Sequence, residues 1–273
     1  MVRPASRALN PLSPFSAHAQ LARESAGSES VSVHLDGRLE LRFMAQNTPK
    51  SEFSARSEGT DHGADRAIII GIDEAGRGPW AGPVTIAAAW LDQDAVAAFP
   101  PGLDDSKKMT AASRATFHGI LTQLPHHHVV LSVPVEVIDR DGILKATLAG
   151  MVRAAELLAK RLSEAGIGEA AQILIDGNQM PPLARPAQTV VKGDSRSLSI
   201  AAASVIAKHE RDGIMQGLAG ENPGYGWERN MGYGTAAHRE ALDRLGVTRH
   251  HRRSFAPIRR LLCDGAETPS SKG

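Results

Sequence analysis

The chain has 273 residues, of which 42% are hydrophobic, which fits one large domain with or without appendages. Its 31 Lys and Arg balance 30 Asp and Glu, so bulk charge does not indicate a nucleic-acid partner, although a local basic patch is still possible. The single cysteine, Cys263, excludes an internal disulfide and a cysteine-based zinc cluster, which favours an intracellular, cytoplasmic protein. Neither a secretory signal nor an apolar run of the roughly 18 residues needed to span a membrane is visible, so we expect no membrane partner.

The first 65 residues differ in composition from the rest of the chain. They are rich in Ser, Ala, Pro, Arg and Glu, which predicts that most of this extension is disordered. Within it, residues 31–43 alternate apolar and polar side chains around an Asp-Gly turn, the pattern of a β-hairpin. One hypothesis is that the protein starts at Met44, in which case part of this extension would be an artefact of the assigned start. At the other end, residues 264–273 are expected to form a flexible tail.

The remainder of the chain has the pattern of an α/β domain. Apolar, β-branched runs predict five strands, at residues 67–72, 84–91, 128–133, 172–175 and 188–191. Apolar positions at spacings of three and four predict helices at residues 111–124, 143–165, 198–216 and 236–245. The first three strands follow one another closely, which favours antiparallel neighbours, and the later order favours a parallel part. We therefore expect a mixed sheet with helices on its faces.

Three of the predicted strands end in acidic residues. Asp73 and Glu74 follow the first strand, Asp176 follows the fourth, and Asp194 follows the fifth. In an open α/β sheet, functional sites form beyond the strand ends. Four carboxylates gathered there would repel one another unless they were protonated or bound a cation. Hard oxygen ligands suit Mg²⁺ or Mn²⁺, and two such ions roughly 3.5–4 Å apart can promote phosphodiester hydrolysis.

A purely structural origin of these acids is also open. Asp-Gly is a common turn, so Asp176 taken alone is more simply a turn residue, and Asp194 is placed to cap the following helix. Asp73 and Glu74 would face opposite sides of a regular strand. They can serve one site only if the strand breaks there, and the glycines at 76 and 78 provide such a break.

The segment Gly76-Arg77-Gly78 is either a plain turn or a loop whose backbone approaches a ligand closely. With Arg77 between the glycines, the ligand would be a nucleic acid. A dinucleotide fingerprint is excluded because Pro79 and the following Gly-Pro pair oppose the helix that such a motif opens, and a P-loop is absent.

The chain resembles the ribonuclease HII family. Between about residues 67 and 262 it contains, in that family's order, GIDEAGRGPWAGPV, LDDSKKM, ILIDGN, VVKGDSRSLSIAAASVIAKHERD, GYGT and HHRRSF. The resemblance implies a catalytic domain at 66–263 with the ribonuclease H-like α/β fold, a mixed five-stranded sheet flanked by helices, and a helical C-terminal portion. It implies a metal-dependent endonuclease that hydrolyses the RNA strand of RNA–DNA hybrids and cuts duplex DNA 5′ to single embedded ribonucleotides. The cuts would leave 3′-hydroxyl and 5′-phosphate ends, in a role of ribonucleotide removal from DNA. The implied cofactor is Mn²⁺ or Mg²⁺, with two ions during catalysis, and we expect a monomer.

The same resemblance assigns residues to roles. The metal-binding catalytic carboxylates would be Asp73, Glu74, Asp176 and Asp194. Gly76, Arg77 and Gly78 would read the ribose 2′-hydroxyl, and Tyr233 would stack against that sugar and help check the ribo-to-deoxyribo junction. Further substrate contacts are expected from four basic residues: Lys107, Lys192, Arg252 and Arg253. The arginines belong to a basic C-terminal segment that would position a duplex through its phosphates. Lys107 can equally be a solvated charge at a helix entry.

Some features fit a structural role or depart from the family pattern. His126, His127 and His128 begin a strand with alternating faces, which favours a polar strand entry over a metal site. The family usually has Asn where this chain has Gly142 and often Lys where it has Met231, so both changes remove possible substrate contacts. Two other functions stay open: a nuclease or integrase-like enzyme with another nucleic-acid substrate, and a hybrid-binding module without catalysis.

Overall fold

In a computed structural model of the protein, the described residues are 28–35, 39–46, 67–97, 99–103, 106, 108–123 and 125–264. Most of the extension predicted to be disordered, all but the first residue of the predicted tail, and Lys107 lie outside these ranges. Within the extension, strands β1 (Ser28–Leu35) and β2 (Leu39–Gln46) pair antiparallel. This pairing confirms the predicted hairpin, which is longer at both ends than the alternating pattern indicated.

The main sheet has five strands in the spatial order β5-β4-β3-β6-β7. Their bounds are β3 Ile69–Ala75, β4 Val84–Trp90, β5 His127–Val133, β6 Gln172–Asp176 and β7 Ala187–Val190. Strand β4 is antiparallel to both β3 and β5, whereas β6 is parallel to both β3 and β7. The predicted mixed sheet is therefore confirmed, with its antiparallel part first and its parallel part second in the chain.

The four predicted helices are present, together with shorter ones that were not predicted. The helices are α1 Gln93–Val96, α2 Ala111–Leu121, α3 Val135–Asp141, α4 Ile143–Glu164, α5 Leu198–Glu221, α6 Trp227–Asn230, α7 Ala236–Leu245 and α8 Ala256–Asp264, with the 3₁₀ turn η3 at Gly193–Ser195. Helices α1, α3 and α6 are too short to show a repeating apolar pattern, which is why the sequence does not reveal them. In the described ranges, no helix is long and apolar enough to cross a membrane.

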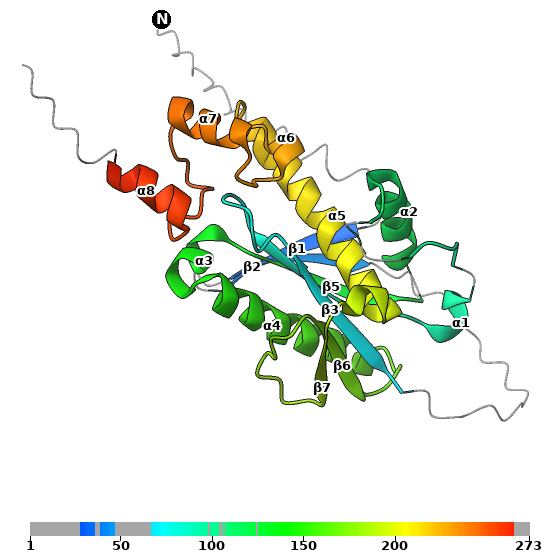
Figure 1. Ribbon diagram of the computed structural model, residues 1–273. Helices are drawn as coiled ribbons and strands as arrows, with labels where there is room; N and C mark the ends of the chain where they lie inside the picture. Colours follow the sequence, from blue (N-terminus) through cyan, green and yellow to red (C-terminus); the bar gives the residue numbers. More distant parts are fainter. Residues whose placement is uncertain are drawn as a thin grey trace, which may run out of the picture.

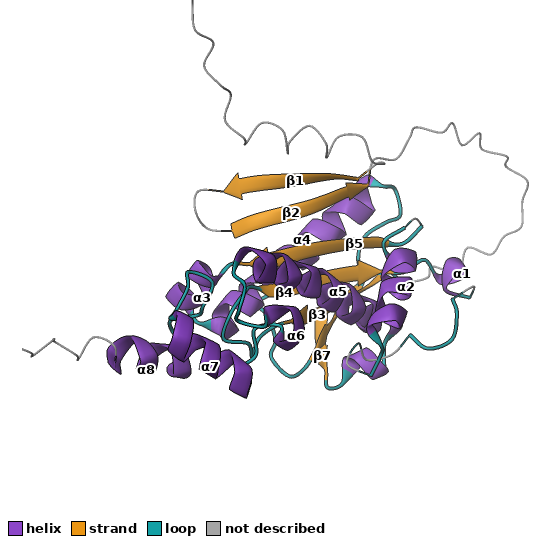
Figure 2. Ribbon diagram, turned by 90° about the horizontal axis from the view of Figure 1, so that it is seen from above, coloured by secondary structure: helices purple, strands orange, loops and turns teal. Residues whose placement is uncertain are grey.

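Helices cover both faces of the sheet (Figures 1 and 2). On one face, Ile70, Ile72 and Ile86 pack with residues of α4 in a buried cluster. On the other face, Ala87 and Ala89 pack with the buried alanines and valine of α5. The small residues allow α5 to approach closely: a Cβ added to Gly71 of β3 would lie 2.2 Å from the carbonyl carbon of Ser199. Helix α5 therefore begins directly on the central strand.

Helices α6, α7 and α8 lie together at one end of the molecule, away from α1 (Figures 1 and 2). A third cluster of buried residues holds them against α5, with Trp227, Met215, Leu242 and Ile258 among its members. This group is the helical C-terminal portion that the family resemblance implied.

Candidate active site

Asp73 and Asp176 occupy matching positions on neighbouring parallel strands. The register pairs Ile72 of β3 with Ile175 of β6, so the two aspartates come one residue later on each strand. Asp73 is opposite Ala87 of β4, which packs in the cluster beneath α5. Two of the predicted acids therefore lie side by side where their strands end, on the face of the sheet that α5 covers.

The side chain of Asp73 is buried among other acids. The residue is 5% exposed, and its carboxylate accepts a hydrogen bond of 2.7 Å from the backbone N–H of Glu74. Burial, and then the negative charges of Glu74 and Asp176, raise the pKa of Asp73 well above its ordinary value, and a hydrogen bond from Ser204 partly offsets this rise. A buried carboxylate beside two further carboxylates is a site that a bound cation would stabilise.

Ser204 of α5 is a site residue that the sequence did not single out. Its hydroxyl lies 2.9 Å from the hydroxyl of Ser106, and both serines are buried. Ser106 belongs to the LDDSKKM motif, so this pair joins that motif to Asp73 through α5. A serine in an alanine-rich helix carries no signal of this role, which depends on the helix lying over β3.

Asp176 is more than a turn residue. Its Oδ1 accepts a 2.7 Å hydrogen bond from the backbone N–H of Gly193, which holds η3 beside the end of β6. Asp194, the next residue in η3, is 8% exposed. It does not cap α5, since the residue at the cap position is Ser197, and no side-chain cap bond forms there. The helix-capping interpretation of Asp194 is therefore not supported.

Glu74 lies on the other side of the strand from Asp73. The break that the glycines predicted is present at Gly76, but it comes after both acids and does not separate them, because β3 continues to Ala75 and Glu74 pairs with Ile86, a residue of the cluster beneath α4. The Glu74 carboxylate forms an ion pair of 3.3 Å with Arg77. As the side chains stand, the described ranges contain no group of three or more His, Cys, Asp and Glu close enough to hold a metal ion.

The glycine-arginine-glycine turn lies against Tyr233, although the two are distant in the sequence. A Cβ added to Gly78 would be 3.4 Å from Tyr233 Cε1. Next to this contact, the backbone N–H of Trp80 donates a 2.8 Å hydrogen bond to the Gly232 carbonyl. The fold therefore brings together the two elements that were predicted to act on the same nucleotide, immediately beyond the acidic end of β3.

Comparison with known proteins identifies the family. The chain matches the family model described as Ribonuclease HII over residues 70–258. A protein described as Ribonuclease HII from Jannaschia sp. (strain CCS1) is 49% identical over 197 residues, which cover 72% of this chain and 93% of the relative.

The chain belongs to the ribonuclease HII family.

Ribonuclease HII enzymes are endoribonucleases, so this membership makes the chain an endoribonuclease of the ribonuclease H type. Solved structures share the fold. Ribonuclease H2 from Pyrococcus horikoshii OT3 has a TM-score of 0.61 and 23% identity, covering 73% of this chain and 99% of that one. Bst-RNase HIII in complex with Mn²⁺ has a TM-score of 0.58 and 22% identity, covering 74% of this chain and 71% of that one.

Two buried arginines hold the loop from Gly76 to Pro83. Arg252 donates to the carbonyl oxygens of Gly76, Arg77 and Gly82 at 2.6, 2.9 and 2.9 Å. Arg211 of α5 donates to the carbonyls of Pro83, Met231 and Ala81 at 3.0, 3.1 and 3.3 Å. Burial lowers the pKa of Arg252 to about 9 and that of Arg211 to about 10.

The expectation that Arg252 contacts substrate phosphates is corrected by this burial. The side chain is 0% exposed, and its guanidinium is engaged by backbone carbonyls, so it supports the turn instead. Arg211 was not predicted as a site residue at all. The sequence places it only in a helical pattern, and nothing in that pattern distinguishes a buried arginine from a solvated one.

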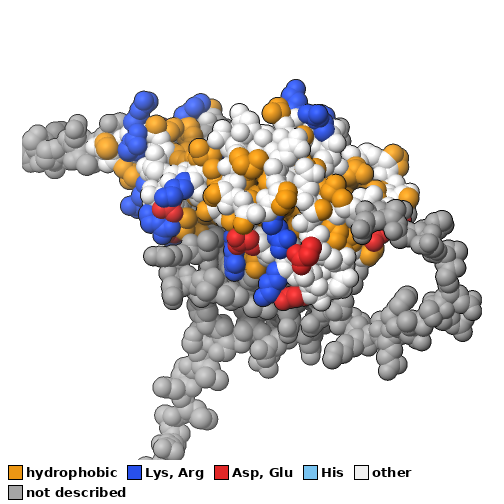
Figure 3. Space-filling view, turned by 90° about the horizontal axis from the view of Figure 1, so that it is seen from below, with side chains coloured by type: hydrophobic (Ala, Val, Ile, Leu, Met, Phe, Trp, Pro, Cys, Tyr) orange, Lys and Arg blue, Asp and Glu red, His pale blue; other side chains and the backbone are white. Residues whose placement is uncertain are grey.

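Of the other predicted basic contacts, Arg253 and Lys192 are exposed. The backbone N–H of Arg253 donates to Asp139 of α3 at 2.9 Å, which fixes the segment that carries it. Figure 3 shows a group of Lys and Arg side chains at the α8 end of the molecule. Lys208 pairs with Asp212 within α5.

Positions 142 and 231, where this chain departs from the family pattern, both have positive φ. Gly142 joins α3 to α4 with φ 83° and ψ 148°, a conformation that favours glycine. Met231 ends α6 with φ 49°, and its carbonyl accepts from Arg211.

The histidines at 126–128 belong to the entry of β5, as expected. His126 Nδ1 accepts a 3.2 Å hydrogen bond from the backbone N–H of Asp92, and His128 is buried.

Proposed function

We propose that this ribonuclease HII is a metal-dependent endonuclease that cuts duplex DNA 5′ to single embedded ribonucleotides and hydrolyses the RNA strand of RNA–DNA hybrids, leaving 3′-hydroxyl and 5′-phosphate ends. The observation that carries the proposal is the burial of Asp73 beside Glu74 and Asp176, on the strand that leads into Gly78 and its contact with Tyr233. An acidic centre and a sugar-reading surface then adjoin each other at the end of β3.

The chemistry of the predicted donor set fits a divalent metal ion, and Glu74 would join it by turning towards Asp73 from the other side of β3. Asp73, Glu74, Asp176 and Asp194 supply only carboxylate oxygens, which suit Mg²⁺ or Mn²⁺. Two such ions, when bound, would activate the attacking water and stabilise the leaving oxygen. The raised pKa of Asp73 supports this assignment, because a carboxylate that is unfavourable in its charged form gains most from a nearby cation. The crystal structure of Bst-RNase HIII with Mn²⁺ supports the choice of metal through the shared fold.

Selection of the ribonucleotide would depend on the turn and on Tyr233. The Tyr233 ring is 50% exposed and borders Gly78, so one of its faces is available to a sugar. Arg252 directs two backbone carbonyls of the turn inward, which leaves Arg77 on the surface. Exposed Arg253 and Lys192, with Lys107, would bind the flanking phosphates without reading sequence. Ribonucleotide removal from DNA, a cytoplasmic location and a monomeric state stay predictions.

The test is cleavage of an end-labelled DNA duplex carrying one ribonucleotide, with Mg²⁺, Mn²⁺ or chelator, beside a continuous RNA–DNA hybrid. We expect one metal-dependent cut 5′ to the ribonucleotide, and products with 3′-hydroxyl and 5′-phosphate ends. Cleavage of the hybrid alone would refute the junction role. Binding without cleavage of either substrate, by folded protein, would favour a hybrid-binding module, and cutting of all-DNA duplexes would favour another nuclease.

A further inference from the structure

A chain of hydrogen bonds through two buried histidines ends on the backbone of Tyr233. The side chains of Trp227, His238 and His251 are all 0% exposed. They come from α6, α7 and the segment before α8, and they meet behind the segment that presents Tyr233. His251 belongs to the HHRRSF motif, but the sequence did not indicate the cluster, because its members are spread over three elements.

The neighbours of His238 determine which of its ring nitrogens carries the proton. The Trp227 indole N–H can only donate, and it lies 3.1 Å from His238 Nε2. Nε2 is therefore the acceptor, and the proton of the neutral ring is on Nδ1. His238 Nδ1 lies 3.0 Å from the Tyr233 carbonyl oxygen, which can only accept. Both bonds are made at once by the Nδ1–H tautomer alone.

The neighbours of His251 determine its tautomer in the same way. The backbone N–H of Thr248 donates to His251 Nδ1 at 3.0 Å, so the proton of this ring is on Nε2. His251 Nε2 lies 3.1 Å from His238 Nε2 and donates to it, so the one acceptor lone pair of His238 is shared between His251 and Trp227. The chain therefore runs in one direction, from Thr248 through His251 and His238 to the Tyr233 carbonyl, and every ring nitrogen has a partner.

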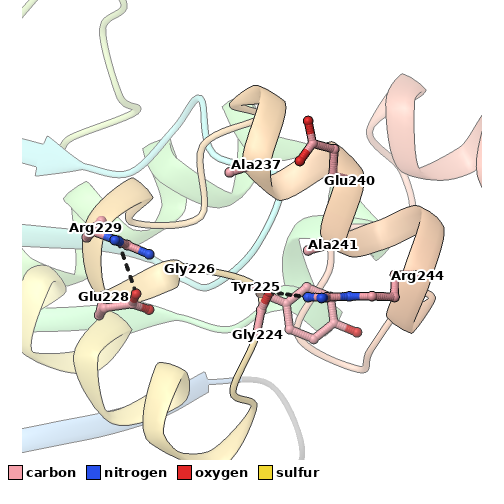
Figure 4. A pocket seen from close by; sticks show the side chains of 9 residues that line it. All are labelled: Gly224, Tyr225, Gly226, Glu228, Arg229, Ala237, Glu240, Ala241 and Arg244. Atoms are coloured by element: carbon pink, nitrogen blue, oxygen red, sulfur yellow. Dashed lines mark hydrogen bonds and ion pairs between the residues drawn. The ribbon is translucent and has the colours of Figure 1, made fainter.

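Both rings are neutral in this arrangement. Burial lowers the pKa of His238, and burial together with His238 lowers the pKa of His251 to about 4. Tyr225 packs against both rings: its ring centroid is 5.2 Å from that of His251 and 6.2 Å from that of His238. The same tyrosine lines a hollow of about 350 Å³ between α6 and α7, which Figure 4 shows.

Tyr233 depends on its backbone for orientation. Tyr233 is half exposed, and glycines flank it on both sides, with Gly232 at φ 81°. The carbonyl of Tyr233 accepts from the N–H of Thr235 at 2.8 Å as well as from His238. Trp80 packs against this segment, since a Cβ added to Gly234 would lie 2.1 Å from Trp80 Cζ2.

We infer that the His251–His238 pair is a positioning device for Tyr233: the Nδ1–H of His238 fixes the Tyr233 peptide so that the ring is held over Gly78, where the ribose is checked. This inference rests on the proposed function, which assigns Tyr233 to the sugar. His238 and His251 are positioning residues, because neither reaches the substrate surface.

Two substitutions at one position separate the hydrogen bond from the packing. The amide N–H of His238→Asn lies near the place of Nδ1 and can donate to Tyr233. The amide of His238→Gln lies near the place of Nε2, so its oxygen can accept from Trp227, but the donor to Tyr233 is lost. The measured quantity is the ratio of kcat/KM on a DNA duplex with one ribonucleotide to kcat/KM on a continuous hybrid. We expect His238→Asn to keep this ratio within about two-fold, and His238→Gln to lower it by about ten-fold, the effect of losing one positioning hydrogen bond.

Equal ratios of kcat/KM for both variants and the wild type would overturn the inference. An equal fall of this ratio in His238→Asn and His238→Gln would also overturn it, because the two histidines would then act through packing alone. Thermal unfolding of each variant reports lost stability separately from lost selectivity. Nitrogen-15 NMR of the wild type tests the pair without any substitution: an Nε2–H tautomer of His238, or a charged ring near neutral pH, would also refute it. A wild-type enzyme that does not cut at single ribonucleotides would refute the proposed function instead, and the tautomers would then decide the inference about the pair.

Discussion

Arg252 Nη2 lies 2.6 Å from the carbonyl oxygen of Gly76, although 176 residues separate the two in the sequence. The same guanidinium reaches two other carbonyls of the 76–82 loop, so a residue near the end of the chain determines the shape of the turn that follows the acids. The planar fork of arginine makes such a three-way contact possible, whereas a lysine ammonium has a different geometry.

The substitution Arg252→Lys should therefore damage the turn. We expect the free energy of unfolding to fall by about 2–3 kcal/mol, because buried carbonyls lose charge-assisted partners. Selectivity for the single ribonucleotide should fall with it. Urea unfolding and the two-substrate cleavage ratio measure these effects, with Arg239→Lys, an exposed arginine of α7, as the stability control. Equal stability of Arg252→Lys and the wild type would contradict the supporting role.

The two glycines of the turn should respond differently to alanine. Gly76 has φ 94°, and a Cβ there would lie 1.8 Å from Arg211 Nε, so Gly76→Ala should destabilise the fold by roughly 2 kcal/mol or more. A Cβ on Gly78 meets only Tyr233 at 3.4 Å, an ordinary contact. Gly78→Ala should keep wild-type stability and lose selectivity for the ribonucleotide. Thermal unfolding measures the stability of both variants, and cleavage of the two substrates measures their selectivity. A Gly76→Ala protein as stable as the wild type would show that Arg211 is not held as described.

Replacing Asp73 should separate activity from stability. Asp73→Asn should abolish cleavage on both substrates, because it removes a charged metal ligand. It should leave stability unchanged or higher by about 1 kcal/mol, because it also removes a buried charge that Glu74 and Asp176 repel. Cleavage assays and chemical unfolding in chelator give the two quantities. An active Asp73→Asn enzyme would overturn the catalytic role, and a strong loss of stability would overturn the electrostatic account.

The strands, the long helices and the positions of the acids could be predicted from the sequence, because each leaves a local signal. Apolar runs mark β3 and β6, and an acid at the end of a core strand is conspicuous in the sequence. A shared site for Asp73 and Glu74 depended on a strand break that the glycines at 76 and 78 suggested, and only the pairing of Glu74 with Ile86 shows that the strand continues past both acids.

The supporting residues could not be predicted, because their role depends on burial that tertiary packing decides. Arg252 and Arg253 are adjacent and chemically identical, yet the first is enclosed by the 76–82 loop and the second is exposed. Ser204 and His238 are similarly ordinary in the sequence. Each gains its role only when α5 lies over β3 or when α6 and α7 meet the C-terminal segment.

The free energy of unfolding should decrease as the pH is lowered below neutrality, because two histidines are buried. Burial lowers the pKa of both His251 and His128 to about 4, below the unfolded value of about 6.5. The folded state then binds fewer protons, so stability is complete above pH 6.5 and is lost as pH falls towards 4. Each histidine should contribute a loss of roughly 2 kcal/mol by pH 5. Urea unfolding at pH 7.5 and 5 measures the loss of stability between the two values. In His251→Gln this loss should be smaller by the contribution of one histidine. An unchanged loss in that variant would show that His251 is not the titrating group.

Restoring a family residue near the recognition surface should strengthen substrate binding. Met231 stands two residues before Tyr233, at a position where the family often has lysine. Its backbone has the left-handed conformation, and its carbonyl accepts a hydrogen bond from Arg211. A lysine there adds one positive charge beside the nucleotide path, enough for about one further phosphate contact. Met231→Lys should lower KM about three- to ten-fold at low salt and steepen the salt dependence of binding by about one unit in the log–log slope. Met231→Gln, similar in length but neutral, is the matched control and should behave like the wild type. Equal gains from lysine and glutamine would assign the effect to shape instead of charge, and no gain from lysine would place position 231 outside the reach of the phosphates.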